Sequence, residues 1–160
     1  MKIKIRKYLP TDKLDLKKCI IELKRYEGQF DADYLTDKRS VDKLFNEIIN
    51  GKNQGGEIFV AEVEDKVVGF IALEIQTKND ELIVKKIKAV YVADVAVLAE
   101  YRNLGIGSQL LKTAQEFAKN NKIKYLKLIV YADNQKARQL YENMGFRDYE
   151  VTMLKEVKLN

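Results

Sequence analysis

The sequence predicts an α/β (α+β) fold in which helices cover both faces of one mixed, mostly antiparallel sheet. Two observations support it. A short polar turn joins two apolar strand-like segments, residues 57–63 and 67–75, as in a β-hairpin. Later in the chain, strand-like segments alternate with amphipathic helical ones, as in strands bridged by helices. The length of 160 residues suits one domain, and we expect a single domain over residues 1–160.

The first third of the chain predicts one strand and two helices. Residues 2–8 alternate basic and apolar side chains, which indicates a strand. Pro10 begins a helix start signal, and an apolar stripe at helical spacing follows it, made of Leu16, Cys19, Ile20 and Leu23. After a loop at 27–37, a second helix should run to about residue 50, with Gly51 as its stop.

The remaining elements follow the hairpin. A longer strand ends in residues 90–98, and an amphipathic helix with Leu110 and Leu111 on its apolar face comes next. We expect a strand at 125–131, a helix closed by Gly145 and a last strand at 148–157. The predicted order is therefore β-α-α-β-β-β-α-β-α-β.

The composition excludes several kinds of chemistry. The chain has no histidine and one cysteine, Cys19, so it holds no His-based metal site, no Ser-His pair and no intrachain disulfide. Cys19 lies on the apolar stripe of a predicted helix, which indicates a core thiol. Carboxylates, tyrosines, lysines or water must carry any proton transfer, and we expect no metal.

Charge and hydropathy favour an ordinary cytoplasmic protein. The net charge of +5 comes from Lys and Glu mixed along the whole chain, as on a solvated surface, although it would also suit an anionic partner. The basic residues are not clustered, and we expect no nucleic-acid partner. No segment approaches the roughly 20 apolar residues of a membrane span, and we expect no membrane partner.

A glycine-containing motif, Arg-Asn-Leu-Gly-Ile-Gly at residues 102–107, lies between a predicted strand and a predicted helix. The first amides of a helix lack internal partners, and phosphates bind there. Gly105 and Gly107 would let a pyrophosphate approach the backbone, and Arg102 could add charge-assisted hydrogen bonds. The motif lacks the lysine of a P-loop and the third glycine of a dinucleotide fingerprint. A merely connecting turn is the alternative.

A second motif follows the next strand. Residues 134–146 read Asn-Gln-Lys-Ala-Arg-Gln-Leu-Tyr-Glu-Asn-Met-Gly-Phe. Together, the two motifs and the order of elements resemble the GNAT superfamily of N-acetyltransferases over essentially the whole chain. The resemblance implies a GNAT-like fold, acetyl-CoA as the co-substrate, and transfer of its acetyl group to an amine. A non-catalytic acyl-CoA-binding sensor and, less well supported, a basic nucleic-acid-binding module are the alternatives.

The resemblance also implies a cofactor site. Its strand part would pair with the pantetheine arm, and its loop would bind the pyrophosphate through backbone amides. Asn134 would hydrogen-bond the cofactor arm, and Tyr141 would lie near the thioester sulfur. The implied cofactor-binding residues are Val95, Ala96, Val97, Arg102, Asn103, Leu104, Gly105, Ile106, Gly107, Ser108, Asn134 and Tyr141.

Two side chains are the candidate catalytic groups. Tyr141 could stabilise the departing thiolate and donate a proton to it, although its position on an apolar helix face also suits a core tyrosine. Asp94 is the candidate base, because a carboxylate within an apolar strand needs a reason to be there. A rim aspartate paired with a lysine is equally consistent, and Glu100 or ordered water are other candidate bases. The amide of Val97 is the candidate oxyanion donor.

The loop between the first two helices is the candidate acceptor site. The resemblance implies that this region walls the acceptor pocket. It is acidic in a basic chain, and its candidate substrate-binding residues are Phe30, Asp31, Asp33 and Tyr34. We expect a cationic amine, such as a polyamine, an aminoglycoside-like amine, or a lysine or N-terminal amine of a peptide. A solvated acidic loop is the alternative. A homodimer could form by strand pairing.

Overall fold

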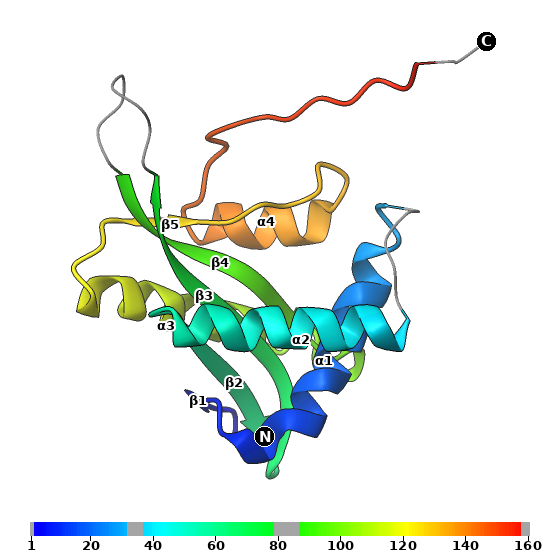
Figure 1. The fold of residues 1–160 in the computed structure, drawn as a ribbon, viewed down its shortest axis with the longest axis vertical. Coiled ribbons are helices and arrows are strands. Elements are labelled where there is room, and N and C mark those ends of the chain that lie inside the picture. Colours follow the sequence, from blue (N-terminus) through cyan, green and yellow to red (C-terminus); the bar gives the residue numbers. More distant parts are fainter. Residues whose placement is uncertain (1, 32–36, 79–86, 158–160) are drawn as a thin grey trace.

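The computed structural model describes residues 2–31, 37–78 and 87–157 (Figure 1). Residues 33 and 34 of the predicted acceptor site lie outside this part. The elements, in chain order, are β1 Lys4–Lys7, η1 Pro10–Asp12, α1 Lys13–Glu27, α2 Lys38–Asn53, β2 Glu57–Val63, β3 Lys66–Lys78, β4 Ile87–Val97, η2 Ala99–Tyr101, α3 Ile106–Asn120, β5 Tyr125–Lys127 and α4 Gln135–Asn143.

One sheet organises the molecule, with the strands in the order β1-β2-β3-β4-β5. The first three pairings are antiparallel and the β4–β5 pairing is parallel, which confirms the predicted mixed, mostly antiparallel sheet. The β2–β3 hairpin turns at Glu64 and Asp65, whose φ angles of 49° and 61° lie in the left-handed region. Such turns match the twist of the strands that they join.

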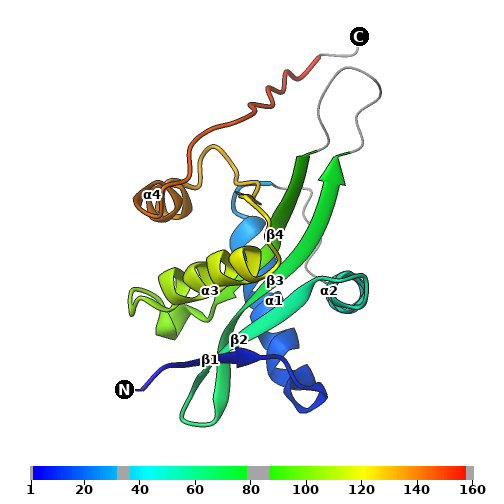
Figure 2. The same cartoon turned by 90° about the vertical axis from the view of Figure 1, so that its left-hand side faces the viewer.

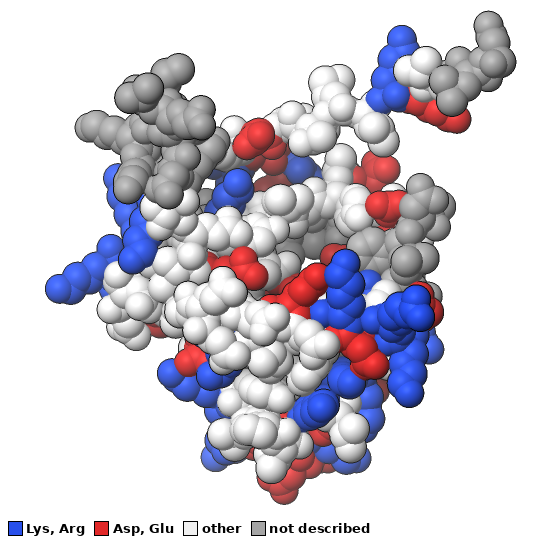
Figure 3. Space-filling view, in the orientation of Figure 1, with Lys and Arg blue, Asp and Glu red and all other residues white. Residues whose placement is uncertain are grey.

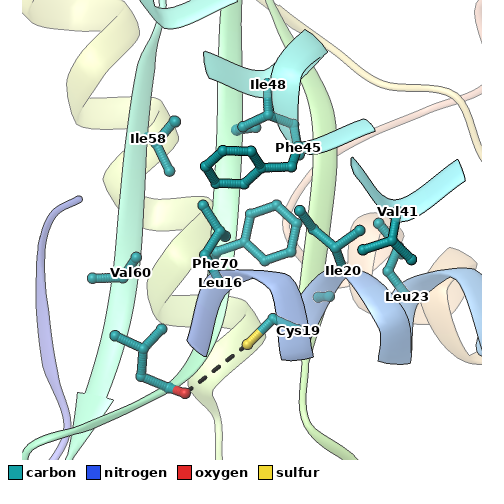
Figure 4. Close-up of a cluster of buried hydrophobic side chains, with 13 residues drawn as sticks. Leu16, Cys19, Ile20, Leu23, Val41, Phe45, Ile48, Ile58, Val60 and Phe70 are labelled. Atoms are coloured by element: carbon teal, nitrogen blue, oxygen red, sulfur yellow. Dashed lines mark hydrogen bonds between the residues drawn. The ribbon is translucent and has the colours of Figure 1, made fainter. Parts of the chain in front are cut away.

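Helices cover both faces of this sheet, as Figure 2 shows. One core cluster packs α1 and α2 against the sheet, with Phe70 of β3 at its centre (Figure 4). A second cluster packs α3 against the opposite face, where Leu110 and Leu111 are fully buried. The alternation of side chains along the strands therefore feeds two separate apolar cores.

An ion cluster fixes the start of the fold. The Arg6 guanidinium donates to both carboxylate oxygens of Asp12, at 2.7 and 2.9 Å, and to Glu62 on β2 at 2.7 Å. Asp12 also accepts from the Leu9 amide at 2.8 Å. These hydrogen bonds hold the pKa of Asp12 below its ordinary value, although burial opposes them. They tie β1, η1 and β2 together.

Three predictions about the helices and strands are wrong. The strand predicted at 125–131 ends at Lys127, because there β5 leaves β4 and loses its ladder. The last predicted strand, 148–157, is not formed: these residues are exposed and have no strand beside them in the described part of the chain. A segment that pairs with no neighbouring strand does not form a strand, whatever its apolar alternation. Gly51 lies inside α2 and does not end it.

Candidate active site

The loop between β4 and α3 has the backbone shape that its sequence predicts. Asn103 and Gly105 adopt left-handed conformations, with φ of 62° and 76°. A side chain on Gly105 would meet nothing within 4 Å, so the backbone angle, and not crowding, favours glycine there. Gly105 is also the N-cap residue of α3, and no side chain caps this end of the helix.

The amides of this loop are free to bind a ligand. The first helical hydrogen bond of α3 runs from the Gln109 amide to the Gly105 carbonyl at 3.1 Å. Within the described residues, the six amides from Asn103 to Ser108 donate no hydrogen bond. Free amides at the positive end of a helix are typical of anion sites. Residues 102–108 also include no carboxylate that would repel a phosphate.

Arg102 is held by the protein itself. Its Nε donates to the Val97 carbonyl at 3.1 Å, and its Nη2 donates to Glu22 of α1 at 2.7 Å. Its guanidinium also lies over the ring of Tyr26, 4.8 Å from the centroid. In this arrangement Arg102 fastens the loop to α1 and β4. A direct contact from Arg102 to a phosphate remains a prediction.

Glycine is required at position 107 for a reason other than the predicted approach of a pyrophosphate. It lies in the first turn of α3, and its φ angle is not positive. A Cβ there would stand 3.3 Å from Leu140 of α4. Gly107 therefore allows α3 and α4 to approach closely. The two sequence motifs meet at this contact, which brings the loop and α4 together.

The sheet opens beside this loop. Strand β4 pairs with β5 only from Ala89 to Tyr91, whereas β4 itself continues to Val97. The far end of β4, residues 92–97, therefore has no ladder on the β5 side. On the β3 side, β4 remains paired through Val97, apart from a bulge near residue 93. Residues 95–97, which the resemblance implies would pair with the pantetheine arm, lie in this part of β4.

The register shows which β4 amides face the opening. The Leu98 amide donates to the Val68 carbonyl of β3 at 2.9 Å. Antiparallel pairs alternate between bonded and non-bonded, so the next pair, Val97 with Gly69, is non-bonded. The amides of Val97 and Val95 therefore point away from β3, toward the opening. Ala96 faces β3 and completes a bonded pair.

Asn134 stands where both motifs meet α1. Its side chain is buried and caps α4, because its Oδ1 accepts from the Ala137 amide at 3.2 Å. The same oxygen accepts from the hydroxyl of Tyr26 at 3.0 Å. Tyr26 thus contacts Arg102 from the first motif and Asn134 from the second. No sequence signal marks Tyr26, since its only pattern is its position one turn beyond the apolar stripe of α1.

Tyr141 lies on α4 in a half-buried position. Its ring packs against Phe146, with 5.8 Å between the centroids. Burial, with smaller contributions from Glu27 and Tyr26, raises the pKa of Tyr141 to about 12. The hydroxyl is therefore neutral and able to donate at any pH near 7.

Asp94 of β4 has a carboxylate with a strongly raised pKa. It pairs with Ala72 of β3, so its side chain is on the face covered by α1 and α2. Burial, and then Glu27, Glu74 and Glu47, raise the pKa of Asp94 to about 7, against a smaller lowering by Lys24. No lysine or arginine forms an ion pair with Asp94 in the described part of the chain, in contrast to the rim-aspartate alternative.

Acidic side chains surround Asp94. Figure 3 shows carboxylates gathered in the middle of the face over α2. Glu47 and Glu74 line an open cleft of about 380 Å³ between α2 and β3. A Cβ on Gly51 would stand 2.9 Å from Glu74 Oε1, so Gly51 makes room for this carboxylate under the helix. We call Glu27, Glu47, Glu74 and Asp94 the acidic cluster. The sequence singles out Asp94 and, within the acidic loop, Glu27, but it does not mark Glu47 or Glu74, because packing alone brings them to Asp94.

Two of the predicted acceptor residues are held beside this site. Phe30 stacks on Tyr131 at 5.9 Å and lies edge-on to Tyr26 at 5.5 Å. The Tyr131 hydroxyl donates to Asp31 at 3.3 Å. The start of the acceptor loop is thus packed onto the segment that follows β5, whereas Asp33 and Tyr34 lie outside the described residues.

One other candidate, Cys19, lies in the core and away from the proposed site. Cys19 is fully buried, with its thiol 4.0 Å from the Val67 carbonyl (Figure 4), and burial raises its pKa to about 12. Glu100 is exposed in η2. Among residues 2–31, 37–78 and 87–157, no group of three or more potential ligands could hold a metal ion. In the same ranges, no helix has the length and apolar character to cross a membrane.

The sequence matches a known protein family and its members. The model of the Acetyltransferase (GNAT) family matches residues 22–146. An uncharacterized N-acetyltransferase of Archaeoglobus fulgidus is 31% identical over 138 residues, which cover 86% of this chain and 90% of that protein.

Solved structures share the whole architecture. The BH1408 protein from Bacillus halodurans, as a tetramutant, has a TM-score of 0.84 at 18% identity, over 96% of this chain and 99% of that chain. AAC(6')-Iy in complex with the bisubstrate analog CoA-S-monomethyl-acetylneamine has a TM-score of 0.71 at 16% identity, over 99% of this chain and 100% of that chain. At these identities the likeness concerns the fold.

Proposed function

The chain belongs to the GNAT family of acetyltransferases and is an acetyl-transferring enzyme, and we propose that it moves the acetyl group of acetyl-CoA to a primary amine of a cationic acceptor by direct attack in a ternary complex. The observation that carries this proposal is the run of six free amides, Asn103 to Ser108, beside the unpaired end of β4.

The loop fits the diphosphate of coenzyme A. Six amide donors at an uncapped helix start, with no carboxylate among them, match an anion with several acceptor oxygens. Val95 and Val97 would hydrogen-bond the extended arm as a strand adds to a sheet, and Asn134 would bind it from α4. When bound, acetyl-CoA supplies an activated acetyl thioester. The structural neighbour AAC(6')-Iy, which binds a CoA-containing analog, supports this assignment.

Asp94 is proposed as the general base. An amine with a pKa near 10.4 is mostly protonated at pH 7, so a proton must leave before the nitrogen can attack. A base works best when its pKa is close to the working pH, and the Asp94 pKa of about 7 meets this condition. Asp94 accepts the proton directly or through water.

Two hydrogen-bond donors complete the proposed machinery. The Val97 amide would hydrogen-bond the carbonyl oxygen as negative charge develops on it. Tyr141, with a pKa of about 12, would donate a hydrogen bond to a thiolate whose reference pKa is 8.5. Because the tyrosine is the weaker acid of the two, it donates a hydrogen bond to the thiolate and keeps its own proton. In addition to burial, the charge of Glu27 raises the pKa of both Asp94 and Tyr141, so both side chains lie near the end of α1.

The acidic cluster supports a cationic acceptor. In addition to burial, Glu27, Glu74 and Glu47 raise the pKa of Asp94, so four carboxylates gather near the unpaired end of β4 in a chain that is basic overall. A positive amine would relieve this repulsion and would bind more tightly than a neutral one. Both a small polyamine-like compound and the lysine or N-terminal amine of a peptide meet this requirement.

Binding and turnover test the proposal separately. We expect acetyl-CoA to bind in calorimetry and free thiol to appear when a cationic amine is added. Tyr141→Phe should lower kcat about 10- to 100-fold with little change in acetyl-CoA affinity. A folded chain without affinity for acetyl-CoA contradicts the proposal. Binding without turnover over a broad panel of amines and peptides would favour the sensor alternative, and DNA binding with a steep salt slope would favour the nucleic-acid module.

A further inference from the structure

Tyr26, near the C-terminal end of α1, contacts parts of the candidate site that lie far apart in the sequence. Its hydroxyl donates to Asn134 Oδ1 at 3.0 Å. The Arg102 guanidinium lies over its ring, 4.8 Å from the centroid, and Phe30 lies edge-on to it at 5.5 Å. One side chain therefore contacts a residue of each cofactor motif and the start of the candidate acceptor loop.

The partners of the Asn134 side chain fix the orientation of its amide group. Its Oδ1 accepts from the Ala137 amide at 3.2 Å and from the Tyr26 hydroxyl. A backbone amide can only donate, so the atom that faces Ala137 must be the oxygen. Both lone pairs of this oxygen are engaged, which leaves Nδ2 as the atom through which Asn134 can bind a ligand.

The Nδ2 atom of Asn134 is accessible, although the residue as a whole is only 8% exposed. Within the described residues this atom donates no hydrogen bond. In the same part of the chain, every fully buried side-chain nitrogen or oxygen has a hydrogen-bond partner. The Nδ2 atom must therefore be in contact with solvent, where it needs an acceptor. The amide carbonyls of the pantetheine arm of coenzyme A are acceptors of this kind.

Three contacts hold the Arg102 side chain in one orientation. Its Nε donates to the Val97 carbonyl at 3.1 Å and its Nη2 donates to Glu22 at 2.7 Å. Its guanidinium lies over the Tyr26 ring, a favourable contact for a planar cation. The free amides of residues 103–108 follow Arg102 directly. The ring of Tyr26 therefore helps to fix the start of the loop that is proposed to bind the diphosphate.

Packing alone does not account for the hydroxyl of Tyr26. A phenylalanine ring would make the same contacts with Arg102 and Phe30. Asn134 would still cap α4 through the Ala137 amide. What the hydroxyl adds is a second donor to Oδ1, which opposes rotation of the Asn134 side chain. The hydroxyl therefore acts on the orientation of Nδ2, the atom that is available to a ligand.

We propose that Tyr26 is a positioning residue for the acetyl-CoA site. Its hydroxyl holds the Asn134 amide with Nδ2 toward the cofactor arm, and its ring holds Arg102 at the start of the loop. Tyr26 acts through these two side chains and not by its own contact with the cofactor. The inference rests on the proposed function, because it requires acetyl-CoA as the ligand.

The first test is calorimetry of the full chain with acetyl-CoA. Tyr26→Phe removes the hydroxyl and keeps the ring, and should raise the dissociation constant for acetyl-CoA about three- to tenfold. Tyr26→Leu also removes the ring from Arg102 and should raise it about 10- to 50-fold. Tyr125→Phe, which removes the hydroxyl of an exposed tyrosine on β5, is the matched control and should stay within about twofold. Circular dichroism checks that each variant is folded.

The second test separates positioning from a merely structural role. Asn134→Asp keeps an oxygen that accepts from Ala137 and Tyr26, so the helix cap remains, but it removes the Nδ2 donor. Its dissociation constant for acetyl-CoA should rise at least about tenfold. Adding Tyr26→Phe to Asn134→Asp should then change the constant by less than about twofold, because the donor that the hydroxyl positions is already gone.

The outcomes distinguish this inference from the proposed function. If Tyr26→Phe binds acetyl-CoA as tightly as the unsubstituted chain, or causes the same loss with and without Asn134→Asp, Tyr26 is not a positioning residue and the proposed function stands. A folded, unsubstituted chain that does not bind acetyl-CoA contradicts the proposed function and this inference with it. If Tyr26→Leu does not fold, Tyr26→Phe and the double variant still decide the question, because both keep the aromatic ring.

Discussion

Asp12 and Asp94 are both withdrawn from water, yet the protein treats them in opposite ways. Asp12 meets Arg6 in two hydrogen bonds and the Leu9 amide in a third, and its pKa is lowered. Asp94 faces Glu27, Glu74 and Glu47, and its pKa is raised to about 7. The first carboxylate is charged at every physiological pH. The second is poised between its two forms.

This difference separates a group that holds the fold from a group that is available for chemistry. A carboxylate satisfied by an arginine stabilises the native state and has little tendency to accept a proton. A carboxylate crowded by its own kind destabilises the native state and readily accepts one. Such an arrangement is typical of functional sites, where perturbed groups persist because other parts of the fold hold them in place.

The largest expected effect is on turnover by the Asp94→Asn variant. Loss of the base should lower kcat by about 100- to 10,000-fold, while the acetyl-CoA affinity stays within about threefold. Steady-state kinetics and calorimetry measure the two quantities. The unsubstituted enzyme should show a rate that rises with pH through an apparent pKa near 7, and the variant should lose this limb. An unchanged pH profile in the variant would assign the base to Glu100 or water.

The matching change at Asp12 should lower the stability of the fold and leave turnover unchanged. Asp12→Asn leaves the Arg6 guanidinium, 21% exposed, with Glu62 as its remaining carboxylate. We expect the free energy of unfolding to fall by about 2–3 kcal/mol at pH 7, in urea denaturation. Because the Asp12 pKa is lowered in the native state, this loss should shrink as the pH falls through that pKa. Unchanged stability at pH 7 would contradict the structural role.

The sequence predicts those features of the fold and of the candidate site that depend on residues close together in the chain. The free amides of residues 103–108 and the 57–63 strand depend on neighbours within a few positions, and local patterns encode them. Tyr26, Glu47 and Glu74 join the site only because α1 and α2 pack on the sheet, and no spacing along the chain marks that. The 148–157 segment has the pattern of a strand but pairs with no strand in the described part of the chain.

A third, smaller effect should appear in the pH dependence of stability. The Asp94 pKa is about 7 in the native state, above its ordinary value of 3.8, so ionisation costs the folded protein stability. The cost is absent below pH 4, grows between pH 4 and 7, and is complete above that. Asp94→Asn removes it, so the variant should gain on the unsubstituted protein by about 2 kcal/mol between pH 4 and pH 8. Water at the half-buried carboxylate reduces the gain from the full pKa shift. A constant difference across this range would contradict the perturbation.

The smallest effect should come from removing one neighbour of Asp94. Glu47→Gln keeps the shape of the cleft and deletes one negative charge, so the pKa in the pH–rate profile should move down toward the ordinary aspartate value. KM for a dicationic amine should rise about three- to tenfold, and KM for acetyl-CoA should not change. Glu116→Gln, which removes an exposed charge on α3, is the matched control and should alter neither value.

Equal effects of the two variants would mean that overall charge, and not the acidic cluster, attracts the acceptor. A shift in pKa without a change in KM would keep Asp94 as the base and remove Glu47 from the acceptor site. The two properties that the cluster is proposed to combine, a tuned base and a cation site, can therefore be separated by one substitution.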